Sequence, residues 1–312
     1  MSEKQSLPKI VISIDFEMRW GVHDLYGLNI DKYRTNIENV QNVVPRMLQM
    51  FSERNIRATW ATVGALGLNS WDEYFAIAPP PPVYHFNNFK INPRYSDMDP
   101  NGVLHFAPNL VQKIVDTTGQ ELGSHSFSHI YFREKGVTVE DFIADAAAVS
   151  SLWKNRYNTR PVSIVFPRNQ SAFVSRLSEC GIHIWRANEN AWYYELTTKQ
   201  KGQSVARILR LYESINPWVK RASQTIKGVC RSSLFIRFNL CETLWELHVK
   251  RLENELNNLL HDDVLHIWWH PHNLGNNMVN RMSRLDRILD LISDRCRTSS
   301  VLSKNMSDCI AT

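Results

Sequence analysis

The chain has 312 residues, of which 43% are hydrophobic and 21% are charged, so it has the composition of a globular protein that can bury a substantial core. No apolar run approaches the roughly 20 residues that a membrane-spanning helix needs, and the first residues lack the apolar segment of a secretory signal. The five cysteines are irregularly spaced and form no zinc-type motif. We therefore expect reduced thiols and a cytoplasmic location, with the inner face of the membrane as an alternative.

The first part of the chain alternates between strand and helix patterns. A β-branched apolar run over residues 8–16 predicts a buried strand, and residues 57–63 predict a second one. Between them, an apolar stripe over 36–54 predicts a helix that Pro45 can kink. This order indicates a parallel sheet with crossover helices. Residues 65–108 then interrupt the rhythm with four consecutive prolines and many aromatic residues, and we interpret them as an ordered insertion that walls a cleft.

The alternation resumes and continues along the chain. Repeated strand–helix units in one α/β domain favour a barrel or an open doubly wound sheet, in which functional groups collect at the carboxyl ends of the strands. We expect one catalytic domain over residues 1–312, with a second insertion at 189–240 and a frayed polar tail at 297–312. Helices are predicted over 109–118, 138–157, 171–180, 241–260 and 277–296, and strands over 162–166, 182–186 and 264–269.

Two pairs of polar residues are candidates for a metal site. His125 and His129 stand four residues apart after a Gly-Ser pair, which lets both imidazoles converge on one cation. A hydrolytic zinc-type site takes three protein ligands and leaves a position open for water. Asp15 and Glu17 follow the first strand with the same side-chain parity, so one can bind the metal and the other can accept a proton from water. The alternatives are hydrogen-bonded histidines and an acidic loop without a metal.

Other polar residues follow later strands. Arg168 can hold the base carboxylate by a bidentate pair, or it can be a surface guanidinium beside a turn proline. His270 can serve as general acid for a leaving amine, because imidazole titrates near neutral pH. We interpret His266 as structural and Asn169 as a candidate contact to the substrate, while His272 can either support the site residues from behind or contact the substrate.

Positive charge is concentrated between residues 201 and 237, where eight basic residues and one acidic residue give a net charge of +7. One interpretation is a solvated helix face. Another is a docking patch for a phosphate-bearing substrate or for an anionic membrane surface. Nucleic acid is not expected, because no recognised binding motif accompanies the charge.

In order, the motifs resemble those of the polysaccharide deacetylase family, carbohydrate esterase family 4, as a divergent member. These are D-x-E after the first strand, H-S-x-x-H after the third, Pro-Arg after the fourth and a histidine after the last. The resemblance covers residues 9–275 and implies a distorted (β/α)7 barrel that hydrolyses N- or O-acetyl groups on sugars with a divalent metal. It implies Glu17, His125 and His129 as ligands, Asp15 as base, Arg168 as the partner of the base, and His270 as acid.

Three motifs differ from the usual family pattern, and one of them is the last, where Trp268-Trp269-His270-Pro271-His272 stands in place of the usual Leu-His. The family has adjacent aspartates where this chain has Asp15 and Glu17 separated by one residue. The family also places arginine before proline in its third motif, whereas here Pro167 precedes Arg168.

The sequence therefore predicts a metal-dependent hydrolase that removes an acetyl or similar small acyl group from an amino sugar or glycan precursor, in surface polysaccharide or O-antigen-type biosynthesis. Zinc is the expected metal, and cobalt, nickel or iron suit the same ligands. The substrate is expected to carry phosphate, as a nucleotide sugar or a lipid-linked sugar, with peripheral membrane contact through 201–237. The alternatives are a metal-free amidohydrolase of the same barrel acting on a small nitrogenous metabolite, and a non-catalytic glycan-binding barrel.

Overall fold

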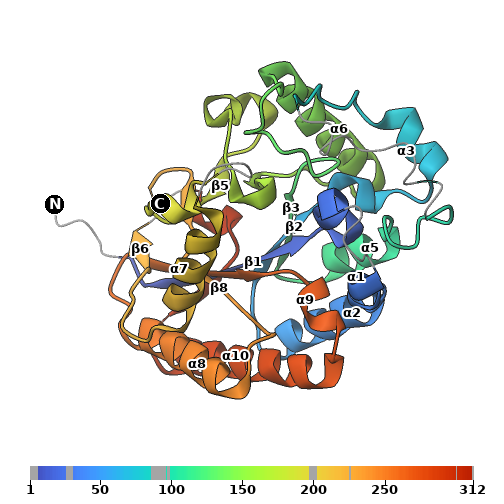
Figure 1. The fold of residues 1–312 in the computed structure, drawn as a ribbon. Coiled ribbons are helices and arrows are strands. Elements are labelled where there is room, and N and C mark those ends of the chain that lie inside the picture. The colour runs from blue at the N-terminus through green and yellow to red at the C-terminus, as the bar shows by residue number, and fades with distance from the viewer. Residues whose placement is uncertain are drawn as a thin grey trace.

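The computed structural model describes residues 6–25, 31–85, 96, 99–196, 202–224, 226–299 and 301–310. Within these residues a curled, mostly parallel sheet occupies the centre of the molecule and helices surround it (Figure 1). The strands are β1 (Lys9–Phe16), β2 (Ala58–Thr62), β3 (Gln120–Ser124), β4 (Ser163–Val165), β5 (Ile184–Ala187), β6 (Ser223–Gln224), β7 (Val229–Arg231), β8 (Leu234–Phe235), β9 (Asp263–Trp269) and β10 (Leu302–Lys304). The helices are α1 (Asp31–Glu38), α2 (Val40–Glu53), α3 (Trp71–Ile77), α5 (Pro108–Asp116), α6 (Val139–Tyr157), α7 (Gln203–Ile215), α8 (Glu242–Asn257), α9 (His272–Gly275) and α10 (Met278–Thr298).

Seven strand positions form the wall of a barrel. Strands β9, β1, β2, β3, β4 and β5 pair in parallel in that order. One stretch of chain fills the gap between β5 and β9, because β7 pairs with β5 while β8, directly after it, pairs with β9. The closing strand is thus divided between its two neighbours, which distorts the barrel. The expected α/β class and the (β/α)7 barrel are confirmed.

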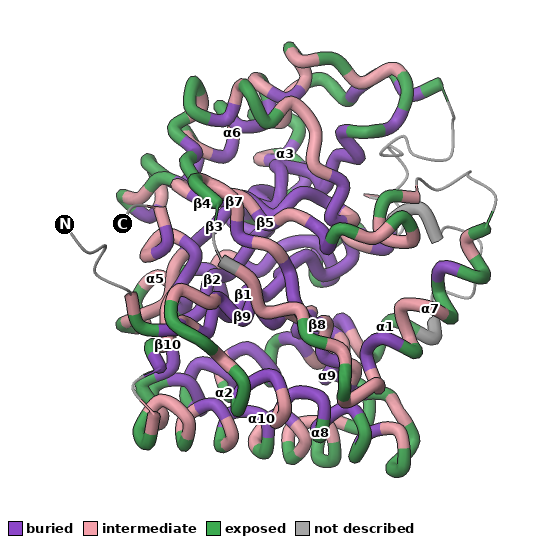
Figure 2. Tube along the Cα trace, turned by 90° about the vertical axis from the view of Figure 1, so that its left-hand side faces the viewer, coloured by how far each residue is buried: buried purple, intermediate pink, exposed green. Residues whose placement is uncertain are grey.

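Alternate residues of β1 face opposite sides of this wall. Ile10, Ile12 and Ile14 pack in the core shared with the surrounding helices, whereas Val11 belongs to a separate apolar cluster. That cluster is the barrel interior, since it takes side chains from several other strands: Ala61, Val165, Ile184, Cys230 and Val264. Figure 2 shows the strands as the most continuously buried part of the molecule. Asp15 shares the parity of Val11, so its carboxylate points into the open end of the barrel.

Most predicted elements are present, with two local differences. Helix α2 runs through Pro45 without a break, and the interruption falls earlier, at Asn39 between α1 and α2. The helix predicted over 171–180 is wrong. Two short 3-10 turns, Val174–Arg176 and Ser178–Cys180, take its place. The reason is local, because Phe173 has a left-handed backbone with φ of 53° and cannot start an α-helix.

The two expected insertions differ in their relation to the barrel. The described part of 65–108 packs α3 against the Met18–Leu25 turn, where Trp71 and Tyr74 contact Trp20. None of its described residues lines the cavity reported below, and residues 86–95 and 97–98 lie outside the described residues. The segment 189–240 is not wholly an insertion, since β7 and β8 complete the barrel wall.

The frayed tail is also a wrong prediction for residues 301–310. Strand β10 pairs in parallel with the first half of β1, where Lys9 faces Leu302. Met306 and Cys309 are buried in the barrel interior cluster, and the Met306 amide donates to Thr59 Oγ1 at 2.7 Å. The tail therefore plugs the amino-terminal end of the barrel. None of the described helices combines the length and the apolar composition that crossing a bilayer requires.

We predict that Met306→Ala lowers the free energy of unfolding by about 2–4 kcal/mol, because it leaves a cavity in a closed core. Leu302→Ala, at a partly exposed position of β10, is the control and should change stability by less than about 1 kcal/mol. Urea unfolding of both variants measures the difference. Equal, negligible effects would indicate that the tail does not pack in the barrel.

Candidate metal centre and active site

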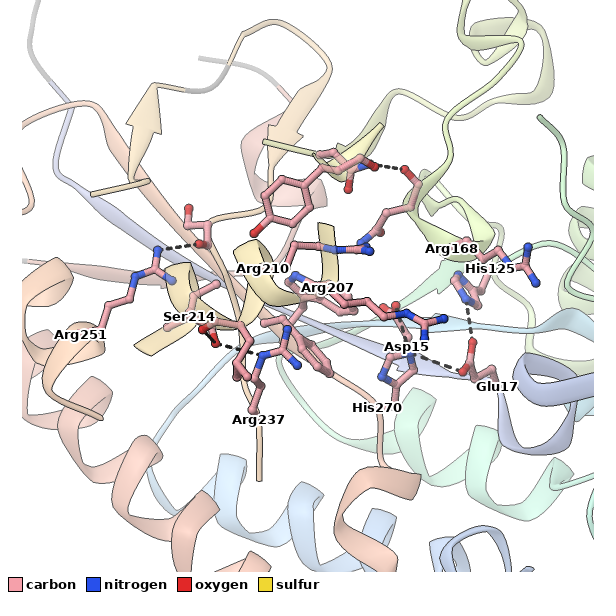
Figure 3. A pocket seen from close by; sticks show the side chains of 18 residues that line it. Asp15, Glu17, His125, Arg168, Arg207, Arg210, Ser214, Arg237, Arg251 and His270 are labelled. Atoms are coloured by element: carbon pink, nitrogen blue, oxygen red, sulfur yellow. Dashed lines mark hydrogen bonds and ion pairs between the residues drawn. The ribbon is translucent and has the colours of Figure 1, made fainter. Parts of the chain in front are cut away.

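The carboxyl ends of β1, β3, β5 and β9 meet at one end of the barrel and border a cavity of about 600 Å³. Figure 3 shows Asp15, Glu17, His125 and His270 gathered at one side of it. These residues are far apart in the sequence and come together because parallel strands end at the same edge. The predicted cluster at the strand ends is therefore present.

Glu17, His125 and His129 form a group with the donor atoms of a metal site. Glu17 Oε2 lies 3.2 Å from His125 Nε2 and 3.0 Å from His129 Nε2. All three side chains are buried, and their ligand atoms lie within 4.8 Å of one another. His125 Nδ1 donates to the Val165 carbonyl at 2.7 Å, which leaves the Nε2 lone pair directed at the group. Two imidazoles and one carboxylate fit a divalent cation.

The position of the Glu17 carboxylate requires a glycine at residue 21. A Cβ atom added to Gly21 would lie only 2.0 Å from Glu17 Cδ, so the turn after β1 needs glycine at this position. Burial raises the pKa of Glu17, but the neighbouring histidine side chains, His270 and His129 above all, outweigh it and hold the pKa well below its usual value. Glu17 is therefore held as a carboxylate, the form that binds cations.

The loop that carries both histidines is held by Asp145 of α6, a residue that the sequence analysis did not single out. Its Oδ1 accepts from Ser126 Oγ at 2.8 Å and from the Phe127 amide at 2.9 Å. Ser126 and His129 both have left-handed backbones, with φ of 69° and 58°, so the loop needs such support. Burial raises the pKa of Asp145 to about 7, although these hydrogen bonds act in the opposite direction.

Arg186 of β5 holds the Asp15 carboxylate. Arg186 NH1 and NH2 lie 2.8 Å and 2.6 Å from the two Asp15 oxygens, a bidentate ion pair. The guanidinium is fully buried, also donates to Ser13 Oγ and Asn169 Oδ1, and lies over the Trp268 ring at 4.1 Å. Burial raises the pKa of Asp15, but the charge of Arg186 dominates, so the pKa lies below its usual value. Asp15 is therefore held as a carboxylate.

The predicted pairing of Arg168 with the base is wrong. Arg168 lies over the Tyr131 ring at 3.7 Å, with an amino group 3.7 Å from Glu134, although it does line the cavity. It sits on a turn with φ of 59°, whereas Arg186 lies inside a strand and points into the barrel. A charged residue in a buried apolar strand was the available signal, because such a charge requires a partner.

His270 borders the cavity as predicted. Its Nε2 lies 3.4 Å from Glu17 Oε1 and 3.8 Å from Asp15 Oδ2. Its Nδ1 donates to Asn273 Oδ1 at 3.2 Å, which directs Nε2 toward the carboxylates. The imidazole therefore faces the two carboxylates at this end of the cavity.

The two predicted substrate contacts have other neighbours. His272 lies behind His270, with ring centroids 4.9 Å apart, and is not among the described residues that line the cavity. Asn169 does line the cavity, but its side-chain oxygen accepts from Arg186, so it positions that guanidinium. His266 is structural as expected: it bonds Ser13 Oγ at 2.7 Å inside the barrel, and burial lowers its pKa to about 3.

The comparisons with known proteins concern the fold. No protein-family model matches the chain, and no curated protein matches its sequence. A Mycobacterium smegmatis protein assigned to the polysaccharide deacetylases is 12% identical with a TM-score of 0.54, over 99% of this chain and 91% of that one. A Pseudomonas aeruginosa PAO1 protein assigned in the same way is 12% identical with a TM-score of 0.50, over 97% and 89%. PuuE allantoinase is 11% identical with a TM-score of 0.54, over 97% and 89%.

The fold is the distorted (β/α)7 barrel of the polysaccharide deacetylase type. Identities this low establish the fold alone. Because an allantoinase is as similar in fold as a deacetylase-type protein, the comparison does not choose the substrate. That choice depends on the residues of the cavity.

We predict that Arg186→Met lowers the free energy of unfolding by about 3–5 kcal/mol, because Asp15 is left buried and unpaired. Arg168→Met is the matched control and should cost about 1 kcal/mol or less, since that side chain is partly exposed. Adding Asp15→Asn to Arg186→Met should recover part of the loss in urea unfolding at pH 7. The opposite ranking of the two arginines would refute the pairing.

A second prediction concerns acid stability. His248 is fully buried: its Nδ1 donates to the Ser214 carbonyl at 2.6 Å and its Nε2 accepts from the Arg237 amide at 3.3 Å. The contact at Nε2 needs neutral imidazole, because a protonated Nε2 cannot accept a hydrogen bond, and burial lowers the pKa of His248 to about 4. The unfolded chain takes up this proton near pH 6.5, so stability is present above that pH and falls, by up to about 3 kcal/mol, as pH drops toward 4.

Urea unfolding at pH 7 and pH 5 measures this effect. His248→Asn, whose amide can still donate to Ser214, should reduce the pH dependence, while His183→Gln at an exposed position should keep it. An unchanged slope in His248→Asn would show that another group is responsible.

Proposed function

We propose that the protein is a metal-dependent deacylase that removes an acetyl or similar small acyl group from an amino sugar. The observation that carries the proposal is the convergence, in one cavity, of the Glu17, His125 and His129 group with the Asp15–Arg186 pair and His270. A cation-binding group, an ionised proton acceptor and an imidazole donor are the parts that amide hydrolysis needs.

The cation would be held by Glu17, His125 and His129. When bound, a divalent metal there polarises the acyl carbonyl and lowers the pKa of water. Zinc is the proposed metal because two imidazoles and a carboxylate are common ligands of hydrolytic zinc, and cobalt, nickel or iron suit the same set.

The side chains of the chain supply the proton transfers. Asp15, kept ionised by Arg186, accepts a proton from the attacking water as its oxygen bonds to the acyl carbon. Protonated His270 gives its Nε2 proton to the sugar nitrogen as the carbon–nitrogen bond breaks, while Asn273 holds the other ring nitrogen. The acid leaves as acetate and the sugar as a free amine. A depressed pKa makes Asp15 a weak but always available base.

The proposed setting is the cytoplasm, on a glycan precursor of surface polysaccharide. Support comes from the fold, which is that of proteins assigned to the polysaccharide deacetylases. A second candidate is a metal-free amidohydrolase acting on a small nitrogenous metabolite, which the equal fold similarity to an allantoinase favours. The two candidates differ in their dependence on Glu17, His125 and His129.

The test is metal content and acetate release measured on the same preparations. We expect wild type to carry about one equivalent of divalent metal and to release acetate from N-acetylated amino sugars, with activity lost in chelator and restored by zinc. His125→Ala should lose both metal and activity. Asp15→Asn should keep the metal and lose activity by about 10²- to 10⁴-fold.

Each alternative has its own result. No metal in wild type after reconstitution, with amide hydrolysis that resists chelator, would replace the proposal by the metal-free amidohydrolase. Binding of acetylated glycan without acetate release would indicate a binding protein. Full turnover by metal-loaded Asp15→Asn would remove Asp15 as the base.

A further inference from the structure

The cavity has a second wall, and it is basic. Arg207 and Arg210 on α7, Arg237 after β8 and Arg251 on α8 all line it. Figure 3 shows Arg237 and Ser214 away from the carboxylates, with Arg207 and Arg210 between the two groups. The same cavity therefore joins the candidate metal centre to a group of guanidinium side chains.

The arginines of this wall differ in whether they form an ion pair with a carboxylate. Arg251 pairs with Glu255 at 3.3 Å. The one acid of α7, Glu213, is already bound by Arg221 at 2.5 Å. Within the part of the chain that the structure describes, no carboxylate forms an ion pair with the remaining three cavity arginines of this wall, Arg207, Arg210 and Arg237.

Arg210 and Arg237 are partly buried, and the hydrogen bonds that they donate through Nε leave their terminal amino groups available to a ligand. Arg237 donates through Nε to Ser214 Oγ at 3.0 Å, and Arg210 donates through Nε to the Ala206 carbonyl at 3.2 Å. Burial and neighbouring positive charge lower the pKa values of both guanidinium groups. Like charges held together in this way are stabilised by a bound anion.

The balance of charge in the whole cavity also favours a bound anion. Its lining contains five arginines and two carboxylates, an excess of three positive charges before any cation binds at the metal centre. A solvated helix face does not explain this, because Arg207 and Arg210 share the cavity face of α7 with Leu211 and Ser214.

We propose that the cavity binds an acylated sugar that carries a phosphate ester, with the acyl group at Glu17 and His125 and the phosphate at Arg207, Arg210 and Arg237. The inference rests on the proposed deacylase function and names its substrate class. Phosphate is favoured over a carboxylate because one guanidinium satisfies a carboxylate, as Arg186 does for Asp15. Three unpaired guanidinium groups match the several oxygens of a phosphate.

The phosphate can be attached to a nucleotide or to a lipid. The face of α7 opposite the cavity bears exposed Val205, Ile208 and Tyr212, and Trp218 follows the helix with 85% of its surface exposed. An exposed apolar face on the helix that also walls a basic cavity is a surface that a lipid carrier would contact. The experiment therefore includes one arm for each source.

The first measurement is calorimetric binding of N-acetylglucosamine 1-phosphate and of N-acetylglucosamine to the full-length protein. We expect the phosphorylated sugar to bind at least about 10-fold more tightly. Arg207→Gln, Arg210→Gln and Arg237→Gln should each weaken it by about 10- to 100-fold and leave the neutral sugar unaffected. Arg46→Gln, which removes an exposed arginine from α2 outside the cavity, is the matched control.

Acetate release from the same samples separates this inference from the proposed function. Equal binding and equal acetate release for both sugars would overturn the phosphate site and leave the deacylase intact. Preferential, arginine-dependent binding of the phosphorylated sugar without acetate release would support the phosphate site and overturn the deacylase function. If the arginine variants keep the preference for phosphate, the assignment of the site to Arg207, Arg210 and Arg237 is wrong.

The two sources are compared with UDP-N-acetylglucosamine and with polyprenyl-diphosphate N-acetylglucosamine in phosphatidylcholine vesicles. Both substrates should lose turnover in the arginine variants. A lipid source predicts that Val205→Ser/Ile208→Ser slows turnover of the vesicle substrate alone. A nucleotide source predicts no effect of that double variant on either substrate. Unchanged turnover of both substrates in the arginine variants would overturn the proposal.

Discussion

The ion pair between Asp15 and Arg186 joins two strands that are not neighbours in the sheet. Strands β1 and β5 lie on different sides of the barrel, with β2, β3 and β4 between them. The Arg186 guanidinium has no contact with water, so its charge is tolerated only because Asp15, Ser13 and Asn169 surround it. One interaction therefore ties the barrel wall together across its interior and fixes the direction of the Asp15 carboxylate.

The candidate metal centre depends on the same strand end and on a separate support. Glu17 follows Asp15 by two residues, so the ion pair that anchors Asp15 also places Glu17 at the cavity. The histidine loop is positioned independently, by Asp145 beneath it and by the bond from His125 to the Val165 carbonyl. Glu17 and the histidines thus meet because two rigid parts of the barrel are each held in place.

The cavity has chemically different ends, and this difference is the strongest clue to its ligand. One end has the carboxylates and imidazoles of the candidate metal centre. The other has Arg207, Arg210 and Arg237, with which no carboxylate of the described residues forms an ion pair. A molecule with a hydrolysable acyl group and a phosphate would satisfy both ends at once. The split closing strand, β7 and β8, brings the basic end close to the candidate metal centre, because Arg237 lies two residues after the end of β8.

The sequence by itself determined the periodic elements, the fold class and the short-range motifs. D-x-E and H-x-x-x-H were recognisable because their spacing alone brings like donors to one face. Pairs that depend on distant strands were not, and Arg186 was missed in favour of Arg168, which is nearer a recognisable motif. Nothing in the chain order of Asp15 and Arg186 shows that the barrel closes them into contact.

The tail and the basic segment were decided by tertiary structure for the same reason. From the sequence alone, the polar tail is expected to be frayed. In the structure, the open end of the barrel buries Met306, and β10 pairs with β1. From the sequence alone, the run of basic residues is also consistent with a solvated helix face. In the structure, α7 is oriented so that two of its arginines line the cavity. Local sequence determines which elements form and which faces they bury, whereas burial against distant partners decides which charged side chains become part of the site.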